Sequence, residues 1–459
     1  MNSTRATPTV QILGGGVPLL ASFLALTLPT MRACPDSPDP ASTETPSSHL
    51  LGDLGGLRPA LAKYGVDVAV EYTGEVMGNV AGGLARGTVY DGLLKAAVDV
   101  DLERLAAWRG ARLHVSSLSP HGRSLSEHYS GDLFTLSNID APDDPRLFEL
   151  WFEQTFGKDY FSVRAGVLAA DEEFAFTEQG SLFINGTCGW PTILALNVPS
   201  PAFPQGALGV RAAWHPSDAW HLQVALYDGD PNPLDADGQP SNPHGVTYAL
   251  NEGALILAEC GYKWHQGSDA AHPPGLCKLG VWYHTAEFNH LYRDDLGFAL
   301  ADPSSSGQPG QLSGNWGCYL TVEQILWREP KRETDSAEGL GAFMRLGAAP
   351  ADRNPAQFYA EGGLTYVGLF PGREADALGL AVVYGQLSDQ LRALARAANQ
   401  FSGSATPLPD FEMVVELTYR FELRPGWSLQ PGLECIIHPG GSPARDPAWV
   451  LGIRTHFDF

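Results

Sequence analysis

Glu149, Trp151 and Glu153 stand at alternate positions of one short segment, followed by Arg164 in the next. Residues two apart lie on the same face of a β-strand, so the two carboxylates and the indole ring would share one surface. Carboxylates and guanidinium groups form charge-assisted hydrogen bonds, and an aromatic ring stacks on a flat apolar surface. The combination suits a neutral ligand that is rich in hydroxyl groups.

Further charged residues occupy the polar positions of similar alternating runs, and we expect them to line the same aqueous interior: Glu71, Arg211, Glu416, Arg420 and Arg454. The predicted constriction combines Arg164, Arg420, Arg454, Glu71, Glu153 and Glu416 with a long loop. A simpler interpretation of any single residue is that it lies on the solvated side of an amphipathic strand and pairs with its neighbours. Both interpretations predict a charged, water-filled lumen.

The elements that must position these side chains are long strands with one apolar and one polar face. In the final segment the apolar or lipid-tolerant residues are Trp449, Leu451, Ile453, Thr455, Phe457 and Phe459, and Arg454, His456 and Asp458 alternate with them. Such a strand places one face in hydrocarbon and the other in water. An outer-membrane barrel needs it, because its last strand must close against the first so that no backbone polar group faces lipid.

Sixteen such strands are predicted, an even number as single-chain bacterial barrels require. They begin near Tyr64, Thr88, Ala111, Leu147, Tyr160, Gly206, Ala219, Gly253, Leu276, Asn315, Leu340, Ala356, Ala377, Asp410, Trp427 and Pro447. The predicted fold is therefore all-β: a 16-stranded antiparallel transmembrane β-barrel with a short N-terminal helix at 54–63. We expect that helix to dock on the periplasmic end of the barrel or inside it.

Short turns alternate with long loops, which are predicted at 119–146, 169–205, 229–252 and 288–314. Short turns on one rim and long loops on the other are typical of an outer-membrane barrel. The loop at 169–205 contains Phe174, Phe176, Phe183 and Trp190, so we do not expect it to be disordered. We expect it to fold into the barrel and narrow it; the alternative is a packed cap over the outer rim.

The N-terminal region predicts export. Residues 1–33 carry an apolar run, Arg5 and Arg32 but no acid, which indicates a signal peptide, followed by a polar linker at 34–50 and the barrel at 51–459. Cys34 after Ala33 leaves lipidation open as a minority interpretation. The six cysteines show no metal-site spacing, and their disulfide pairing cannot be deduced.

Several classes of function are excluded by composition and motifs. The formal net charge of −23 becomes −25 once the two arginines of residues 1–33 are removed, which disfavours nucleic-acid binding. There is no Gly-x-Ser-x-Gly, His-Glu-x-x-His or Gly-rich phosphate motif, and no i, i+4 histidine pair on a helical segment. We predict no catalytic residues, no metal and no cofactor.

Several segments taken in order resemble the carbohydrate-selective porin family, the glucose-porin type. They are Gly52–Arg58, Leu61–Val66, Glu149–Gln154, Arg164–Gly166, Glu173–Ala175, Leu182–Asn185, Pro204–Gly209, Ala225–Pro231, Leu429–Pro431 and His438–Gly441. The chain departs from the family pattern at Leu54, where Trp is usual, and at Val198–Pro201.

The resemblance implies an outer-membrane porin of a Gram-negative bacterium for passive, sugar-selective diffusion of mono- and small oligosaccharides. The alternatives are a general or ion-preferring porin, or a structural or adhesive barrel with a closed lumen. Expected partners are sugars, outer-membrane lipid and, through Phe459, the barrel-assembly machinery. The chain is expected to be a monomer or a homotrimer.

Overall fold

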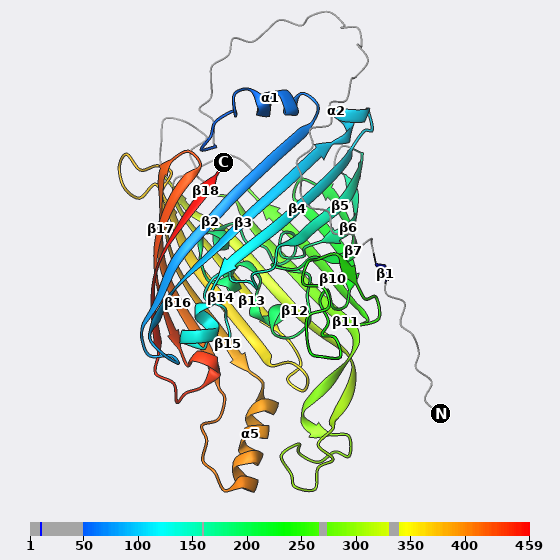
Figure 1. Cartoon of the computed structure of the whole chain (residues 1–459), viewed down its shortest axis with the longest axis vertical. Helices are drawn as coiled ribbons and strands as arrows, with labels where there is room; N and C mark the ends of the chain where they lie inside the picture. Colours follow the sequence, from blue (N-terminus) through cyan, green and yellow to red (C-terminus); the bar gives the residue numbers. More distant parts are fainter. Residues whose placement is uncertain (1–9, 12–48, 158–159, 266–272, 330–338) are drawn as a thin grey trace, which may run out of the picture.

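The computed structural model describes residues 10–11, 49–157, 160–265, 273–329 and 339–459. Sixteen of the strands in these residues form a closed barrel, in which each strand pairs with its chain neighbours and β18 pairs with β2 (Figure 1). All of the pairings are antiparallel. The predicted fold class is confirmed. Apart from Val10 and Gln11, the predicted signal peptide and most of the linker lie outside the described residues.

The barrel strands follow the predicted order. They are β2 (Val66–Ala81), β3 (Gly87–Asp101), β4 (Ala111–Gly122), β5 (Arg146–Phe156), β6 (Phe161–Leu168), β7 (Ala207–Ser217), β8 (Trp220–Asp228), β10 (Ala254–Trp264), β11 (Gly275–Asp294), β12 (Pro309–Arg328), β13 (Gly339–Ala348), β14 (Ala356–Val367), β15 (Ala377–Leu387), β16 (Phe411–Arg424), β17 (Trp427–Ile437) and β18 (Ala448–Asp458). Two short strands, β1 (Val10–Gln11) and β9 (Thr247–Tyr248), pair with each other outside the barrel sheet. All but one of the barrel strands begin within two residues of the predicted position.

The exception is β12, which begins at Pro309 instead of near Asn315. It forms a hairpin with β11 that continues beyond the wall and projects from one end of the molecule (Figure 1). The predicted loop at 288–314 is wrong at both flanks, since residues up to Asp294 and from Pro309 are strand. Register shifts after His284 and Asn289 accompany this extension. Outside the membrane the hairpin needs no apolar face, so the alternation that predicts the other strands is weak there.

The alternation along each strand separates lipid from lumen. On β16, Leu417 is 45% exposed on the outer wall, whereas its neighbours Glu416 and Thr418 are buried inside the barrel. No helix in the described part of the chain is both long enough and apolar enough to cross a membrane.

The α-helices lie at the ends of the barrel and in its loops. They are α1 (Leu57–Ala62), α2 (Leu102–Ala106), the short α3 (Gly186–Gly189) and α4 (Thr192–Ala195), and α5 (Asp389–Ser402). The helix predicted at 54–63 is present but shorter. It docks at the end of the barrel that carries the C-terminus, where Arg58 donates hydrogen bonds to the carbonyl oxygens of Val68 and Phe459 (Figure 1).

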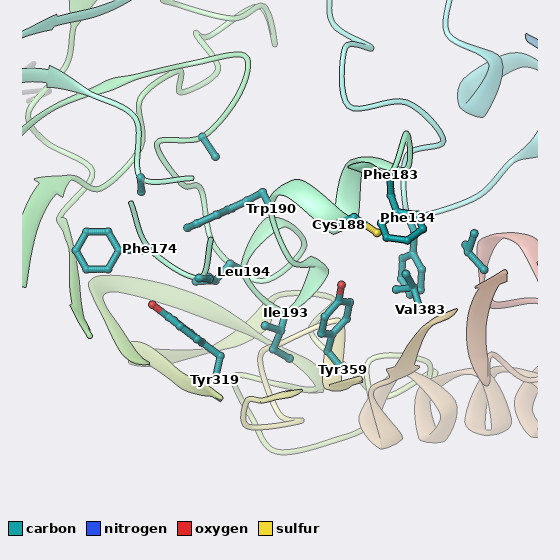
Figure 2. Close-up of a cluster of buried hydrophobic side chains, with 14 of the residues drawn as sticks. Phe134, Phe174, Phe183, Cys188, Trp190, Ile193, Leu194, Tyr319, Tyr359 and Val383 are labelled. Carbon is teal, nitrogen blue, oxygen red and sulfur yellow. The ribbon is translucent and has the colours of Figure 1, made fainter. Parts of the chain in front are cut away.

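The long loop between β6 and β7 lies inside the barrel, which confirms the predicted infolding. Phe174, Phe183 and Ile193 of this loop are fully buried, together with the inward side chains Tyr319 and Tyr359 of the wall (Figure 2). Phe134 of the preceding long loop joins the same cluster. Apolar packing therefore fills part of the lumen with loop.

Candidate functional site

Glutamates of the wall hold the infolded loop by its backbone. Glu259 accepts a hydrogen bond from the N–H of Ala175 at 2.9 Å, and Glu323 accepts one from Gln179 at 2.8 Å. An amide buried in the barrel must find an acceptor, and a carboxylate is a strong one. Because the strand carbonyl groups are already used in the sheet ladder, the wall side chains supply these acceptors.

Arg345 performs the complementary role for carbonyl groups. Its guanidinium donates to the carbonyl oxygens of Ala175 at 2.6 Å, Thr187 at 2.9 Å and Cys188 at 3.0 Å. Its charge is balanced by Glu361 at 2.6 Å, and neither side chain is exposed to solvent. Arg345 therefore holds the loop from wall strand β13 and does not face open lumen.

Two of the predicted site residues belong to this anchoring set. Glu416 accepts hydrogen bonds from the N–H groups of Ile184 at 2.8 Å and Asn185 at 3.0 Å. Glu149 accepts one from Ala169 at 3.2 Å. Both glutamates are 2% exposed, so they bind the loop and are not open to a passing solute.

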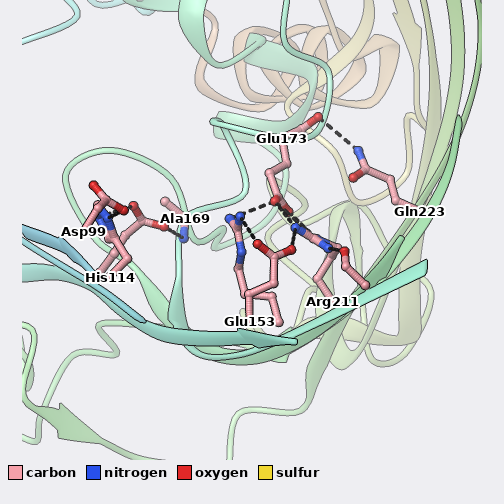
Figure 3. A network of polar contacts seen from close by, with 10 residues as sticks. Asp99, His114, Glu153, Ala169, Glu173, Arg211 and Gln223 are labelled. Carbon is pink, nitrogen blue, oxygen red and sulfur yellow. Dashed lines mark hydrogen bonds and ion pairs between the residues drawn. The ribbon is translucent and has the colours of Figure 1, made fainter. Parts of the chain in front are cut away.

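A four-membered charge cluster joins β5, β6 and β7 to the loop (Figure 3). Glu153 lies 3.2 Å from Arg164 and 3.0 Å from Arg211, and Glu173 of the loop lies 2.8 Å and 2.6 Å from the same two arginines. Arg211 also donates to Ser162 at 2.7 Å. Two carboxylates thus balance two guanidinium groups.

Glu173 was not predicted as a site residue, although its place in the infolded loop was part of the sequence prediction. To predict its ion pairs with Arg164 and Arg211, one must know which loop residue meets which wall strand. The alternation of the strands carries no such information.

The Trp151 ring packs against Arg164 of this cluster and against His114, and it does not offer a free stacking surface. The Arg164 guanidinium carbon lies 3.7 Å from the centre of its ring, and the His114 ring is stacked on it at 4.9 Å. The Trp151 side chain is 8% exposed. A cation over an aromatic face is stabilised by the ring quadrupole, so the indole fixes the position of Arg164.

The structure does not join the other predicted residues to this cluster. Arg454 pairs with Glu75 at 2.8 Å rather than with Glu71, and it donates to Ser137 of the preceding long loop at 3.2 Å. Glu71 lies opposite Lys95 and Asp458 in the sheet register. Arg420 lies half-buried on β16 and forms no ion pair with any described residue.

Two cavities border the infolded loop on the side of the lumen formed by β3–β8. The larger, of about 440 Å³, lies between the wall strands β3–β5 and both infolded loops, and its lining includes Lys95, Asp171 and Glu172. The smaller, of about 300 Å³, is lined by Glu153, Glu173 and Arg211. Lys95 and Glu172 form an ion pair at 3.2 Å with both side chains partly exposed. Charged groups therefore take part in the lining of both cavities.

Asp171 adds an ionisable group to the larger cavity. Its Oδ2 accepts a hydrogen bond from the N–H of Phe203 at 2.8 Å, whereas its Oδ1 is buried without a partner. Burial, reinforced by the nearby charge of Glu172, raises the pKa of Asp171 to about 7. The described residues contain no group of three His, Cys, Asp or Glu side chains arranged to hold a metal ion.

A closed barrel with an apolar outer wall and a charged interior narrowed by its own loops is the architecture of a porin. The model of the carbohydrate-selective porin, OprB family, matches residues 85–459, and the chain belongs to this family. It is accordingly a sugar-selective porin of the Gram-negative outer membrane.

Individual relatives agree with this assignment. Porin B of Pseudomonas aeruginosa is 27% identical over 440 residues, which cover 90% of this chain and 92% of the relative. The putative porin QuiX of Acinetobacter baylyi is 23% identical over 434 residues, with coverages of 89% and 93%. The high-pH structure of Pseudomonas putida OprB has the same fold, with a TM-score of 0.80 at 23% identity, over 91% of this chain and all of that chain.

The pKa of Asp171 predicts a pH-dependent ion preference. Above pH 7 the carboxylate is ionised and favours cations in the larger cavity, and below pH 7 it becomes protonated and this contribution is lost. The cation preference, measured as the reversal potential in a KCl gradient across a planar bilayer, should fall between pH 8 and pH 6. Asp171→Asn should abolish most of this change; an equal change in the variant would assign the titration to another group.

Proposed function

We propose that mono- and small oligosaccharides diffuse passively through the two cavities, past Lys95 and Glu172 and then past the cluster of Arg164, Arg211, Glu153 and Glu173. No energy source or cofactor takes part, and no catalytic activity accompanies transport. The observation that supports this route most directly is that members of the balanced charge cluster line one of two cavities beside the infolded loop, while the partly exposed pair of Lys95 and Glu172 lines the other.

The geometry of Arg164 suits brief contacts with sugar hydroxyl groups. Its guanidinium is fixed by Glu153, Glu173 and the Trp151 ring, yet its side chain remains 17% exposed. Arginine has five donor N–H groups, so a guanidinium paired with carboxylates retains donors for a passing hydroxyl group. Because the pairs are fixed before the sugar arrives, little entropy is lost on contact.

The balance of charge argues against the alternative of an ion-preferring porin. A charged solute would have to compete with an existing ion pair, whereas a neutral sugar can accept hydrogen bonds from arginine and donate to glutamate without separating the pair. Liposome swelling with glucose, an amino acid and a charged solute of equal size separates the two functions. Equal permeation of all three would support a general porin, and no permeation would support a closed adhesive barrel.

We also propose two further partners, outer-membrane lipid and the barrel-assembly machinery. The apolar outer wall suits outer-membrane lipid. Phe459 follows β18, and its N–H donates to the carbonyl oxygen of Val70 on β2 at 3.0 Å; we assign to it recognition by the barrel-assembly machinery during insertion.

Replacing Arg164 by Ala should weaken the saturable phase of sugar transport. A hydrogen bond to a charged group contributes about 1.5–3 kcal/mol, so its loss should raise the half-saturating sugar concentration about tenfold or more. The measurement is sugar-dependent block of single-channel current. The matched control is Arg353→Ala, which removes an arginine paired with Asp352 in the turn between β13 and β14. Unchanged saturation in Arg164→Ala, or an equal effect in the control, would contradict the assigned role.

Lys95 and Glu172 should set the size limit of the larger cavity. Their ion pair connects β3 to the infolded loop, and it is exposed enough that it contributes little to stability. Lys95→Met should therefore leave the barrel folded but increase disaccharide permeation relative to monosaccharide in liposome swelling. Arg109→Met, which removes a surface pair with Glu103, is the control. An unchanged ratio of disaccharide to monosaccharide flux would exclude this pair from the constriction.

A further inference from the structure

Two histidines face each other across the hairpin of β7 and β8. His215 lies near the end of β7 and His221 near the start of β8, on either side of the turn at Asp218 and Ala219. Nδ1 of His221 lies 2.8 Å from Nε2 of His215, and the ring centroids are 4.7 Å apart. Their spacing of six positions matches no helical metal motif, so only the folded hairpin brings the two imidazoles together.

The pair belongs to the inner face of the wall. His215 and Arg211 are an even number of positions apart on β7, and such residues share a face of the strand. Both histidines line the smaller cavity together with Arg211. Their neighbours Trp214 and Trp220 point the other way and are 42% and 45% exposed on the outer wall. His215 is exposed and His221 is half-buried, so the pair is open to the water of the lumen.

The distance between the two nitrogen atoms fits a shared metal ion. Imidazole nitrogen binds an ion such as Zn²⁺ at about 2.0–2.1 Å, so two nitrogens at a right angle around one ion lie about 2.9 Å apart. The observed 2.8 Å is close to this separation. A tetrahedral ion would hold the nitrogens about 3.3 Å apart. The pair therefore suits adjacent positions of a tetragonal ion, the geometry that Cu²⁺ and Ni²⁺ adopt with nitrogen and oxygen ligands.

The surrounding charges favour an ion that bonds to nitrogen over one held by charge alone. Lys278 and Lys263 both act electrostatically on His221, and they would repel a hard cation such as Ca²⁺ or Mg²⁺. The carboxylates of this cavity, Glu153 and Glu173, are already paired with arginines. A borderline ion with a strong preference for imidazole is the better occupant.

We propose that His215 and His221 bind one Cu²⁺ or Ni²⁺ ion in the lining of the smaller cavity. The two rings share one hydrogen bond; on metal binding its hydrogen moves to the far nitrogen of the same ring, and both near nitrogens then offer a lone pair. Since the described residues provide no third His, Cys, Asp or Glu ligand, water completes the coordination, and the cavity of about 300 Å³ has room for it.

The bound ion would change the passage of solute. It adds positive charge and ordered water to the cavity that Arg211, Glu153 and Glu173 also line. We expect it to slow sugar diffusion there. This consequence rests on the proposed sugar route, whereas binding of the ion does not.

Binding is tested on the untagged protein in a mild detergent, titrated with Cu²⁺ and followed by calorimetry and electron paramagnetic resonance. Wild type should bind one ion per chain with nitrogen coordination, and Ni²⁺ should bind more weakly than Cu²⁺. His221→Gln and His215→Gln each remove one ligand and should lower the Cu²⁺ affinity about tenfold or more, since even the partners of a metal ligand contribute that much. His128→Gln, which removes a histidine of the loop before β5, is the control and should bind as wild type does.

Circular dichroism should show the same strand content in all variants. Liposome swelling with a sugar, with and without Cu²⁺, then separates this site from the proposed route. Cu²⁺ should slow the flux through wild type and His128→Gln, but not through His221→Gln. Nitrogen-coordinated binding without an effect on flux would uphold the site and count against the route. The site would be overturned by a wild type that binds no Cu²⁺, or by unchanged affinity in both His215→Gln and His221→Gln.

Discussion

The interior of this barrel depends on one constraint: the backbone amides of an infolded loop need acceptors where the sheet has none to spare. Wall glutamates supply them, with Glu259 bonded to Ala175, Glu323 to Gln179 and Glu416 to Ile184. An unsatisfied buried amide costs about 1–3 kcal/mol, so each of these contacts matters to the position of the loop. Arg345 completes the arrangement by donating to the loop carbonyl groups.

This constraint determines which part of the lumen remains open to a solute. Apolar packing of Phe174, Phe183 and Ile193 closes the side of the lumen against which the loop lies, and the cavities remain along β3–β8. The charged side chains of the wall therefore serve two purposes. Those covered by the loop hold it in place, whereas Arg164 and its partners stay partly exposed and are available to a hydroxyl-bearing solute.

The period of two along the chain was enough to predict the strands, because a strand with one face in lipid and the other in water must alternate. It failed at the β11–β12 hairpin, which leaves the membrane and loses that requirement. The same period placed Glu149, Glu153, Arg164 and Glu416 inside the barrel, but it could not distinguish a carboxylate that binds the loop from one that faces the lumen. That distinction depends on which loop atoms reach each wall position. The pairing of Arg454 with Glu75 rather than Glu71 depends instead on the register in which β18 closes against β2.

Hydrogen exchange at Ile184 and Asn185 tests the anchoring of the loop most directly. Both amides donate to Glu416, so in wild type they should be strongly protected. In Glu416→Ala they should exchange about tenfold faster or more, as loss of a hydrogen bond to a charged group implies. Glu422→Ala, on the same strand, should leave them unchanged. Equal protection of the two amides in wild type and Glu416→Ala would show that packing alone holds the loop, and would contradict the anchoring role of the wall carboxylates.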